Sequence, residues 1–106
     1  MMAVSIPSGM TSVIVPAFNE EHIIKQTISE LTQVLDTNLP AYEVVIVDDG
    51  STDNTSGVIA KIAERDPRVK LVAYSPNQGK GYALRRGFSI SQGEVIVFFD
   101  ADLDIP

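Results

Sequence analysis

The sequence alternates apolar runs of strand length with stretches in which apolar residues recur at helical spacing. The strand-like runs are residues 12–15, 43–47, 69–73 and 94–99, and the helical stretches are 20–35, 51–63 and 81–91. The order is therefore β-α-β-α-β-α-β. Strands and helices that alternate in units of about 30 residues form right-handed crossovers. The sequence thus predicts an α/β fold, a doubly wound parallel β-sheet with helices on both faces.

Composition sets the limits of this fold. The 106 residues, 44% of them hydrophobic, are enough for one domain, which we place at residues 11–106 after a flexible N-terminal tail at 1–10. The formal net charge of −6 argues against nucleic acid as a partner. The apolar runs are far shorter than the roughly 18 residues that cross a bilayer, and no signal peptide is recognisable. We expect a cytoplasmic chain with no transmembrane segment.

Three carboxylates follow the last strand-like run, at Asp100, Asp102 and Asp104. Two like charges about 5 Å apart, at an effective dielectric of about 20, repel by about 3 kcal/mol, which a bound cation offsets. The chain has no cysteine, so a metal site must use oxygen or imidazole ligands. These aspartates are therefore candidate ligands for Mg²⁺ or Mn²⁺. The alternative is that they are solvated aspartates of a turn or helix cap.

The loop after the first strand carries Pro16, Ala17, Asn19 and Glu20. A proline cannot donate to a central ladder, so we expect the strand to end at Pro16. The free N–H groups of the following helix would suit phosphate or carboxylate groups. Ordinary helix-start chemistry explains the loop equally well.

The loop after the second strand brings Asp48 and Asp49 to the same edge of the sheet. Such an aspartate could accept hydrogen bonds from the N–H edge of a nucleobase. The alternative is a turn through Gly50, with Ser51 or Asp53 capping the next helix. We expect that local role for Ser51 and Asp53 but none for Asp48 and Asp49.

A glycine-rich segment with Asn77, Gly79 and Lys80 precedes the third helix. Glycine lets a backbone approach a phosphate closely, and the lysine could offset its charge. The segment matches neither the phosphate loop nor the dinucleotide-binding glycine motif, which argues against nucleotide hydrolysis and a dinucleotide fold. The alternative is a strand-to-helix turn, with Ala83 and Gly87 permitting close helix packing.

Taken together, four segments resemble the N-terminal, nucleotide-sugar-binding part of family-2 glycosyltransferases. The segments are 12–21 (SVIVPAFNEE), 45–53 (VIVDDGSTD), 77–81 (NQGKG) and 100–102 (DAD). Within that family the chain looks most like the dolichyl- and polyprenyl-phosphate sugar transferases. Where that branch often has a glutamine two residues after the second aspartate, this chain has Asp104.

The resemblance implies a GT-A fold and a role for particular residues. Pro16, Ala17 and Asp49 would contact the base, with Glu20 and Asp48 lining the same pocket. The D-x-D motif would place Asp100 and Ala101 at the ribose or metal and Asp102 at the metal.

The resemblance assigns no catalytic residue to this chain. The family's catalytic base lies beyond the metal motif, and the chain ends at Pro106, shortly after that motif. We therefore expect the base beyond Pro106.

The function that the resemblance implies is metal-dependent, inverting transfer of a sugar from a nucleotide-diphosphate sugar to an acceptor such as polyprenyl or dolichyl phosphate. A longer parent protein would then lie at the cytoplasmic face of the membrane. Two alternatives are a sugar-phosphate nucleotidyltransferase and a truncated, non-catalytic nucleotide-binding or assembly module. A truncated domain should leave apolar surface or a sheet edge uncovered, so we also expect a homo-oligomer.

Overall fold

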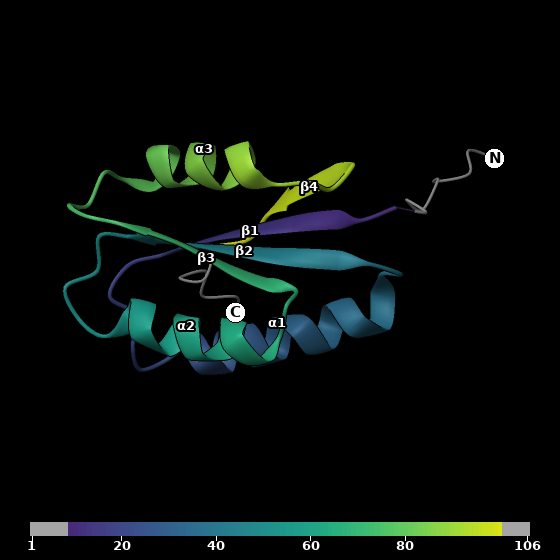
Figure 1. The fold of residues 1–106 in the computed structure, drawn as a ribbon, viewed down its shortest axis with the longest axis horizontal. Helices are drawn as coiled ribbons and strands as arrows, with labels where there is room; N and C mark the ends of the chain where they lie inside the picture. The colour runs from purple at the N-terminus through teal and green to yellow at the C-terminus, as the bar shows by residue number, and fades with distance from the viewer. Residues whose placement is uncertain (1–8, 101–106) are drawn as a thin grey trace.

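The computed structural model describes residues 9–100, which form a four-stranded parallel sheet between two layers of helices (Figure 1). The strands are β1 (Thr11–Ala17), β2 (Tyr42–Asp49), β3 (Val69–Tyr74) and β4 (Val95–Phe98). The helices are α1 (Ile24–Asn38), α2 (Thr55–Arg65) and α3 (Lys80–Ile90). The predicted element order and fold class are confirmed.

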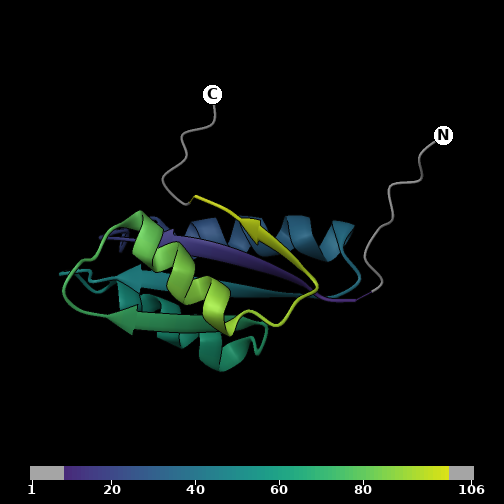
Figure 2. The same cartoon turned by 90° about the horizontal axis from the view of Figure 1, so that it is seen from above.

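The strand order β3-β2-β1-β4 means that the chain changes direction after β3. It first moves outward from β1 to β3 and then returns to the other side of β1. Because each crossover is right-handed, this change carries the helix to the opposite face of the sheet. Helices α1 and α2 cover one face and α3 the other, as Figures 1 and 2 show. The strand order reverses between β1 and β4, and sheets of this kind bind ligands at that point.

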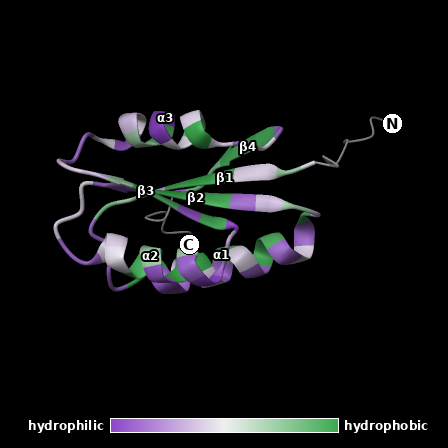
Figure 3. Ribbon diagram, in the orientation of Figure 1, coloured by the Kyte–Doolittle hydropathy of each residue, from purple (hydrophilic) through white to green (hydrophobic). Residues whose placement is uncertain are grey.

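The central strands β1 and β2 are buried along their whole length. Alternate side chains point to opposite faces, so Val13 and Val15 pack toward α1 and α2 while Ile14 packs toward α3. Figure 3 shows the resulting pattern, with apolar strands between helices whose outer sides are hydrophilic. The expected close packing of α3 is confirmed at Gly87, where a Cβ atom would lie 2.5 Å from Cγ2 of Ile14.

Two predicted boundaries are wrong. Pro16 does not end β1 but lies inside it, paired in register with Val47. The backbone oxygen of Ile14 points to β4, where it accepts a hydrogen bond from Phe99 N. Because backbone polar groups two residues apart in a strand point to the same side, the nitrogen of Pro16 also points to the β4 side, beyond the last paired residues of β1 and β4. The proline thus removes no ladder bond. Helix α1 begins at Ile24 rather than at Glu20, whose carbonyl accepts from Ile23 N and Ile24 N in a preceding turn.

The last two residues of the predicted N-terminal tail, Gly9 and Met10, contact the rest of the fold. The predicted tail at 1–10 lies mostly outside the described residues, but Gly9 N donates to Glu94 Oε1 and Met10 O accepts from Glu94 N. Among residues 9–100, no helix is long and apolar enough to cross a membrane.

Apolar side chains are exposed on the outer strand β4 and on α3. They are Phe88, Ile90, Val95, Val97 and Phe98. Because β4 has a paired neighbour on only one side within the described residues, its outer edge is open. The expected uncovered apolar surface is therefore present, and the homo-oligomer that we infer from it stays a prediction.

A buried carboxylate joins the strands at the edge where they begin. Glu43 is 1% exposed and accepts hydrogen bonds from Ser12 Oγ at 2.6 Å, Lys70 Nζ at 2.6 Å and Gln92 N at 2.7 Å. Ser12 Oγ in turn accepts from Gly93 N. The network ties β1, β2 and β3 to the loop that leads into β4. Burial by itself raises the pKa of Glu43, but the hydrogen bonds from Gln92, Lys70 and Ser12 outweigh it and lower that pKa below its ordinary value.

We predict that Glu43→Gln lowers the free energy of unfolding at pH 7 by about 2 kcal/mol, because an amide nitrogen would face a donor and Lys70 would lose its charge partner. Glu64→Gln, a change on the exposed face of α2, should have little effect. A carboxyl whose pKa is lower in the folded state stabilises above its unfolded pKa and loses this effect as the pH falls through the folded pKa. The difference in the free energy of unfolding between wild type and Glu43→Gln, measured by urea titration, should therefore shrink below about pH 4. A difference that does not change with pH would contradict the role of the charge.

Candidate functional site

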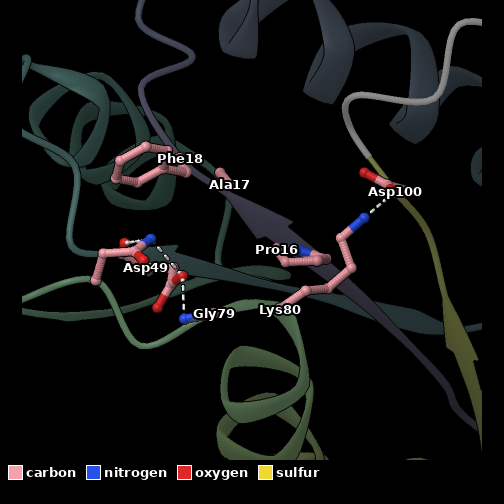
Figure 4. A pocket seen from close by; sticks show the side chains of 8 residues that line it. Pro16, Ala17, Phe18, Asp49, Gly79, Lys80 and Asp100 are labelled. Carbon is pink, nitrogen blue, oxygen red and sulfur yellow. Dashed lines mark hydrogen bonds and ion pairs between the residues drawn. The ribbon is translucent and has the colours of Figure 1, made fainter.

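A cavity of about 190 Å³ opens at the edge of the sheet where the strands end (Figure 4). It is formed by the ends of β1 and β2, the loop before α3, the first residue of α3 and the residues that follow β4. The residues that line it are Pro16, Ala17, Phe18, Asp49, Asn77, Gly79, Lys80 and Asp100. Four segments that are far apart in the sequence therefore meet in one place.

Most of the predicted site residues line this cavity, and Phe18 is the one that sequence reasoning missed. Its side chain is 42% exposed at the end of β1. The signal available in the sequence was an aromatic residue in the loop that follows the first strand. The predicted residues Asn19, Glu20 and Asp48 are not among the lining residues.

Part of the predicted site lies outside the described residues. This part comprises Ala101, Asp102 and Asp104, which the sequence assigns to the ribose and the metal, and the segment runs on to Pro106. The structure therefore does not test these assignments. The expectation that the catalytic base lies beyond Pro106 likewise stays a prediction.

Asp49 has a local structural role, contrary to the expectation. Oδ1 accepts hydrogen bonds from Tyr74 Oη at 2.7 Å and Gln78 N at 2.8 Å, and Oδ2 accepts from Asn77 Nδ2 at 2.7 Å and Gly79 N at 2.9 Å. The carboxylate thus fixes the glycine-rich loop against β2. Burial and the hydrogen bond to Asp49 raise the pKa of Tyr74 above its ordinary value.

Asp48 also has a local role that the sequence analysis did not predict. The side chain is 3% exposed, and its Oδ1 accepts hydrogen bonds from both the backbone N–H and the hydroxyl of Ser51. This pair of bonds closes the turn through Gly50 and engages the Asp48 carboxylate there rather than in the cavity. The predicted cap role of Ser51 is wrong, because its hydroxyl is used in this turn and in a bond to the β1–α1 loop.

The loops after β1 and β2 are joined by paired hydrogen bonds. Asn19 N donates to Ser51 Oγ at 2.8 Å, and Asn19 Oδ1 accepts from Thr52 N at 2.8 Å. Further along, Glu20 N donates to Thr55 Oγ1 at 2.9 Å. Asn19 makes its bonds from a backbone with φ of 51°, a left-handed conformation that asparagine tolerates. Asn19 and buried Glu20 therefore build the frame of the site.

Asp53 completes the same frame. Its Oδ1 accepts from the backbone N–H and the hydroxyl of Thr55, the first residue of α2, and its Oδ2 accepts from Glu21 N. The hydrogen bond from the Thr55 hydroxyl is the largest cause of the lowered pKa of Asp53. The N-cap residue of α2 is Asn54, which makes no side-chain cap bond, so Asp53 does not occupy the predicted cap position but satisfies the N–H of Thr55 from one residue before that position.

Lys80 and Asp100 form an ion pair at one side of the cavity, joining Lys80 Nζ to Asp100 Oδ2 (Figure 4). The lysine is the first residue of α3, and the aspartate stands at the end of the described chain after β4. Their side chains are 57% and 32% exposed. The Asp100 carboxylate therefore lies beside the cavity with a cationic side chain as its partner. Within residues 9–100 no group of three carboxylate or histidine side chains is arranged to hold a metal.

The chain matches the model of a known protein family. The family model described as "Glycosyl transferase family 2" matches residues 12–106. The chain belongs to this family. The same span holds all four segments that meet at the cavity, so family membership and geometry concern the same residues.

Relatives of this glycosyltransferase family 2 chain are considerably longer than it is. It is 39% identical over 103 residues to the dolichyl-phosphate beta-glucosyltransferase of Homo sapiens, covering 91% of this chain and 32% of that protein. This chain spans about a third of that relative's length.

Solved structures show the same fold. The mannosyltransferase PcManGT from Pyrobaculum calidifontis, in complex with GDP-Man and Mn²⁺, has a TM-score of 0.75 and 34% identity, covering 89% of this chain and 28% of that one. S. aureus TarS in complex with UDP-GlcNAc has a TM-score of 0.69 and 33% identity, covering 88% of this chain and 26% of that one. Neighbours of this chain thus bind nucleotide sugars, and one of them binds Mn²⁺ as well.

Gly50 is the position at which a small change should damage the site most. It has a φ of 73°, and an added Cβ atom would lie 2.3 Å from Asn77 N. We predict that Gly50→Ala lowers the free energy of unfolding by about 2–4 kcal/mol, from backbone strain and displacement of the loop that Asp49 holds.

Gly81→Ala is the matched control, because the nearest atom to its added Cβ is Arg85 Nη1 at 3.9 Å. Inside a helix this change should leave stability unchanged or raise it by up to about 1 kcal/mol. Urea denaturation of both variants measures the difference. Equal stability of the two would contradict the close approach of the loops.

Proposed function

We propose that the cavity binds a nucleotide-diphosphate sugar and that the protein transfers the sugar to an acceptor by a metal-dependent, inverting displacement. The observation that carries the proposal is that four loop segments meet at one cavity, at the carboxyl edge of the sheet. Seven of the residues that line this cavity are ones that the sequence predicts as binding residues. Family membership and neighbours that bind GDP-Man and UDP-GlcNAc support it.

The base would lie against Phe18, between the end of β1 and the glycine-rich loop. Aromatic side chains provide a stacking surface for any nucleobase. A carboxylate offers about four acceptor positions, and Asp49 uses them for four donors of the chain itself. For Asp49 to accept from a base N–H, one of these donors has to give way. We therefore assign it first to holding the loop and second to the base.

The diphosphate would lie between Gly79 and Lys80 on one side and Asp100 on the other. Asp102 and Asp104, with Asp100, are the candidate ligands for Mg²⁺ or Mn²⁺, and Ala101 is a candidate contact of the nucleotide sugar. When bound, such an ion supplies charge stabilisation to the nucleotide diphosphate as it leaves. The residues of the chain orient the donor and hold its charge next to that leaving group.

The acceptor that we favour is a polyprenyl or dolichyl phosphate. The likeness to a dolichyl-phosphate glucosyltransferase supports this class. A phosphate acceptor is already ionised at neutral pH, so it needs no strong base from the protein. A longer protein of this kind would act at the cytoplasmic face of a membrane.

One competing function is a non-catalytic nucleotide-binding or assembly module. Incubating the chain with UDP- and GDP-sugars and polyprenyl phosphate separates the two, since sugar transfer excludes the inert module. The other alternative, a sugar-phosphate nucleotidyltransferase, is disfavoured by the family and by the acidic segment at Glu20 and Glu21, where that class has basic residues.

We predict that the chain binds UDP or GDP in a calorimetric titration with Mn²⁺ and that Phe18→Ala weakens this binding. Loss of a stacking surface costs about 1–3 kcal/mol per base, a decrease of about 5- to 150-fold in affinity. Phe88→Ala is the matched control, because Phe88 is 57% exposed on α3 and does not line the cavity.

The same titration tests the metal ligands. Asp102→Ala should abolish the part of the affinity that depends on Mn²⁺ and leave the part that remains in chelator. Nucleotide binding that keeps its full metal dependence in Asp102→Ala, or that is equally weak in Phe18→Ala and Phe88→Ala, would contradict the proposal.

A further inference from the structure

The ion pair between Lys80 and Asp100 stands between two cavities. A second cavity of about 140 Å³ adjoins the first, and the residues that line it are Pro16, Lys80, Leu84, Phe98, Phe99 and Asp100. Pro16, Lys80 and Asp100 line both cavities. In Figure 4 the lysine side chain extends past Pro16 to reach Asp100. The pair therefore lies where the two cavities adjoin, and a ligand that fills the first cavity touches it.

The charged side chains that line the first cavity already have partners within the chain. Asp49 is fully engaged by donors of the glycine-rich loop and of Tyr74. Lys80 is the one cationic side chain among the described residues that line the cavity, and Asp100 is its partner. A dianionic group that enters there meets a carboxylate and an ammonium already paired with each other. The ammonium has three donors and can bind such a group while still beside Asp100, but repulsion between that group and the Asp100 carboxylate favours separating the pair.

We propose that Lys80 exchanges partners when the ligand binds, moving its ammonium from Asp100 to the diphosphate and leaving the Asp100 carboxylate for a divalent cation. This inference rests on the proposed function, because it concerns the diphosphate of the same ligand. Before binding, Lys80 neutralises Asp100 where the two cavities adjoin. After binding, the cation replaces the ammonium at Asp100.

The geometry makes the exchange inexpensive and gives it a direction. Both side chains are partly exposed, and ion pairs of this kind contribute little net stability. The lysine stem can swing from its position at the start of α3, whereas Asp100 follows closely on the end of β4. Lys80 is therefore the partner that moves. It also competes with a divalent cation for Asp100 as long as no diphosphate is present.

Because Lys80 competes with a cation for Asp100 but attracts the diphosphate, its loss should change the affinities for the two ligands in opposite directions. Without Lys80, a divalent cation alone should bind more tightly, because the ammonium no longer occupies Asp100. A diphosphate alone should bind more weakly, because it loses its cationic partner. A lysine that only stabilised the fold would not produce both effects.

The test is calorimetric titration of the full chain and of Lys80→Gln with MnCl₂ alone, with pyrophosphate alone and with UDP or GDP. We expect Mn²⁺ alone to bind about two- to fivefold more tightly to Lys80→Gln. Pyrophosphate and the nucleoside diphosphate should bind about tenfold more weakly. Lys80→Arg, which keeps the charge, should restore diphosphate binding.

Lys61→Gln removes the same charge from an exposed position on α2, on the opposite face of the sheet, and should change neither affinity. Unfolding curves of Lys80→Gln that match those of wild type show that the fold is intact. Mn²⁺ affinity that is unchanged or lower in Lys80→Gln overturns the exchange even where nucleotide binding to wild type supports the proposed function. A wild-type chain that binds neither UDP nor GDP contradicts the proposed function itself.

Discussion

The site depends on the carboxylate of Asp49, which joins the end of β2 to the start of α3. Three of the four hydrogen bonds that it accepts fix the loop from Asn77 to Gly79, and the fourth comes from Tyr74 in β3. The loop sets where α3 begins and so where Lys80 lies. Gly50 is required beside it because the two loops approach too closely for a side chain. One buried interaction thus determines both the shape of the cavity and the place of its cationic residue.

The rest of the site is built on two frames at opposite edges of the sheet. At the carboxyl edge, Asn19 and Ser51 join the loops after β1 and β2, so that Phe18 stands at a defined place beside the cavity. At the other edge, Glu43 and Ser12 hold the loop that leads into β4, whose far end is followed by Asp100. Asp100 therefore reaches the cavity from a strand that is fixed where it begins.

Periodicity was sufficient to predict the element order, the parallel sheet and the edge at which the loops gather. It could not predict that Asp48 and Asp49 hold loops, because their roles depend on turn geometry and, for Asp49, on donors as far as 30 positions away, such as Gly79 N. The place of Pro16 inside β1 depends on where β4 stops pairing, which no local pattern contains. Phe18 was missed because its exposure at the cavity follows from the tertiary fold.

A crystal structure of the chain soaked with MnCl₂ and UDP or GDP would show directly whether the cavity is the nucleotide and metal site. We expect an anomalous manganese peak beside Asp100, the base against Phe18 and the diphosphate next to Lys80. A nucleotide bound elsewhere, or a cavity edge that holds neither metal nor nucleotide at saturating concentrations, would contradict this assignment.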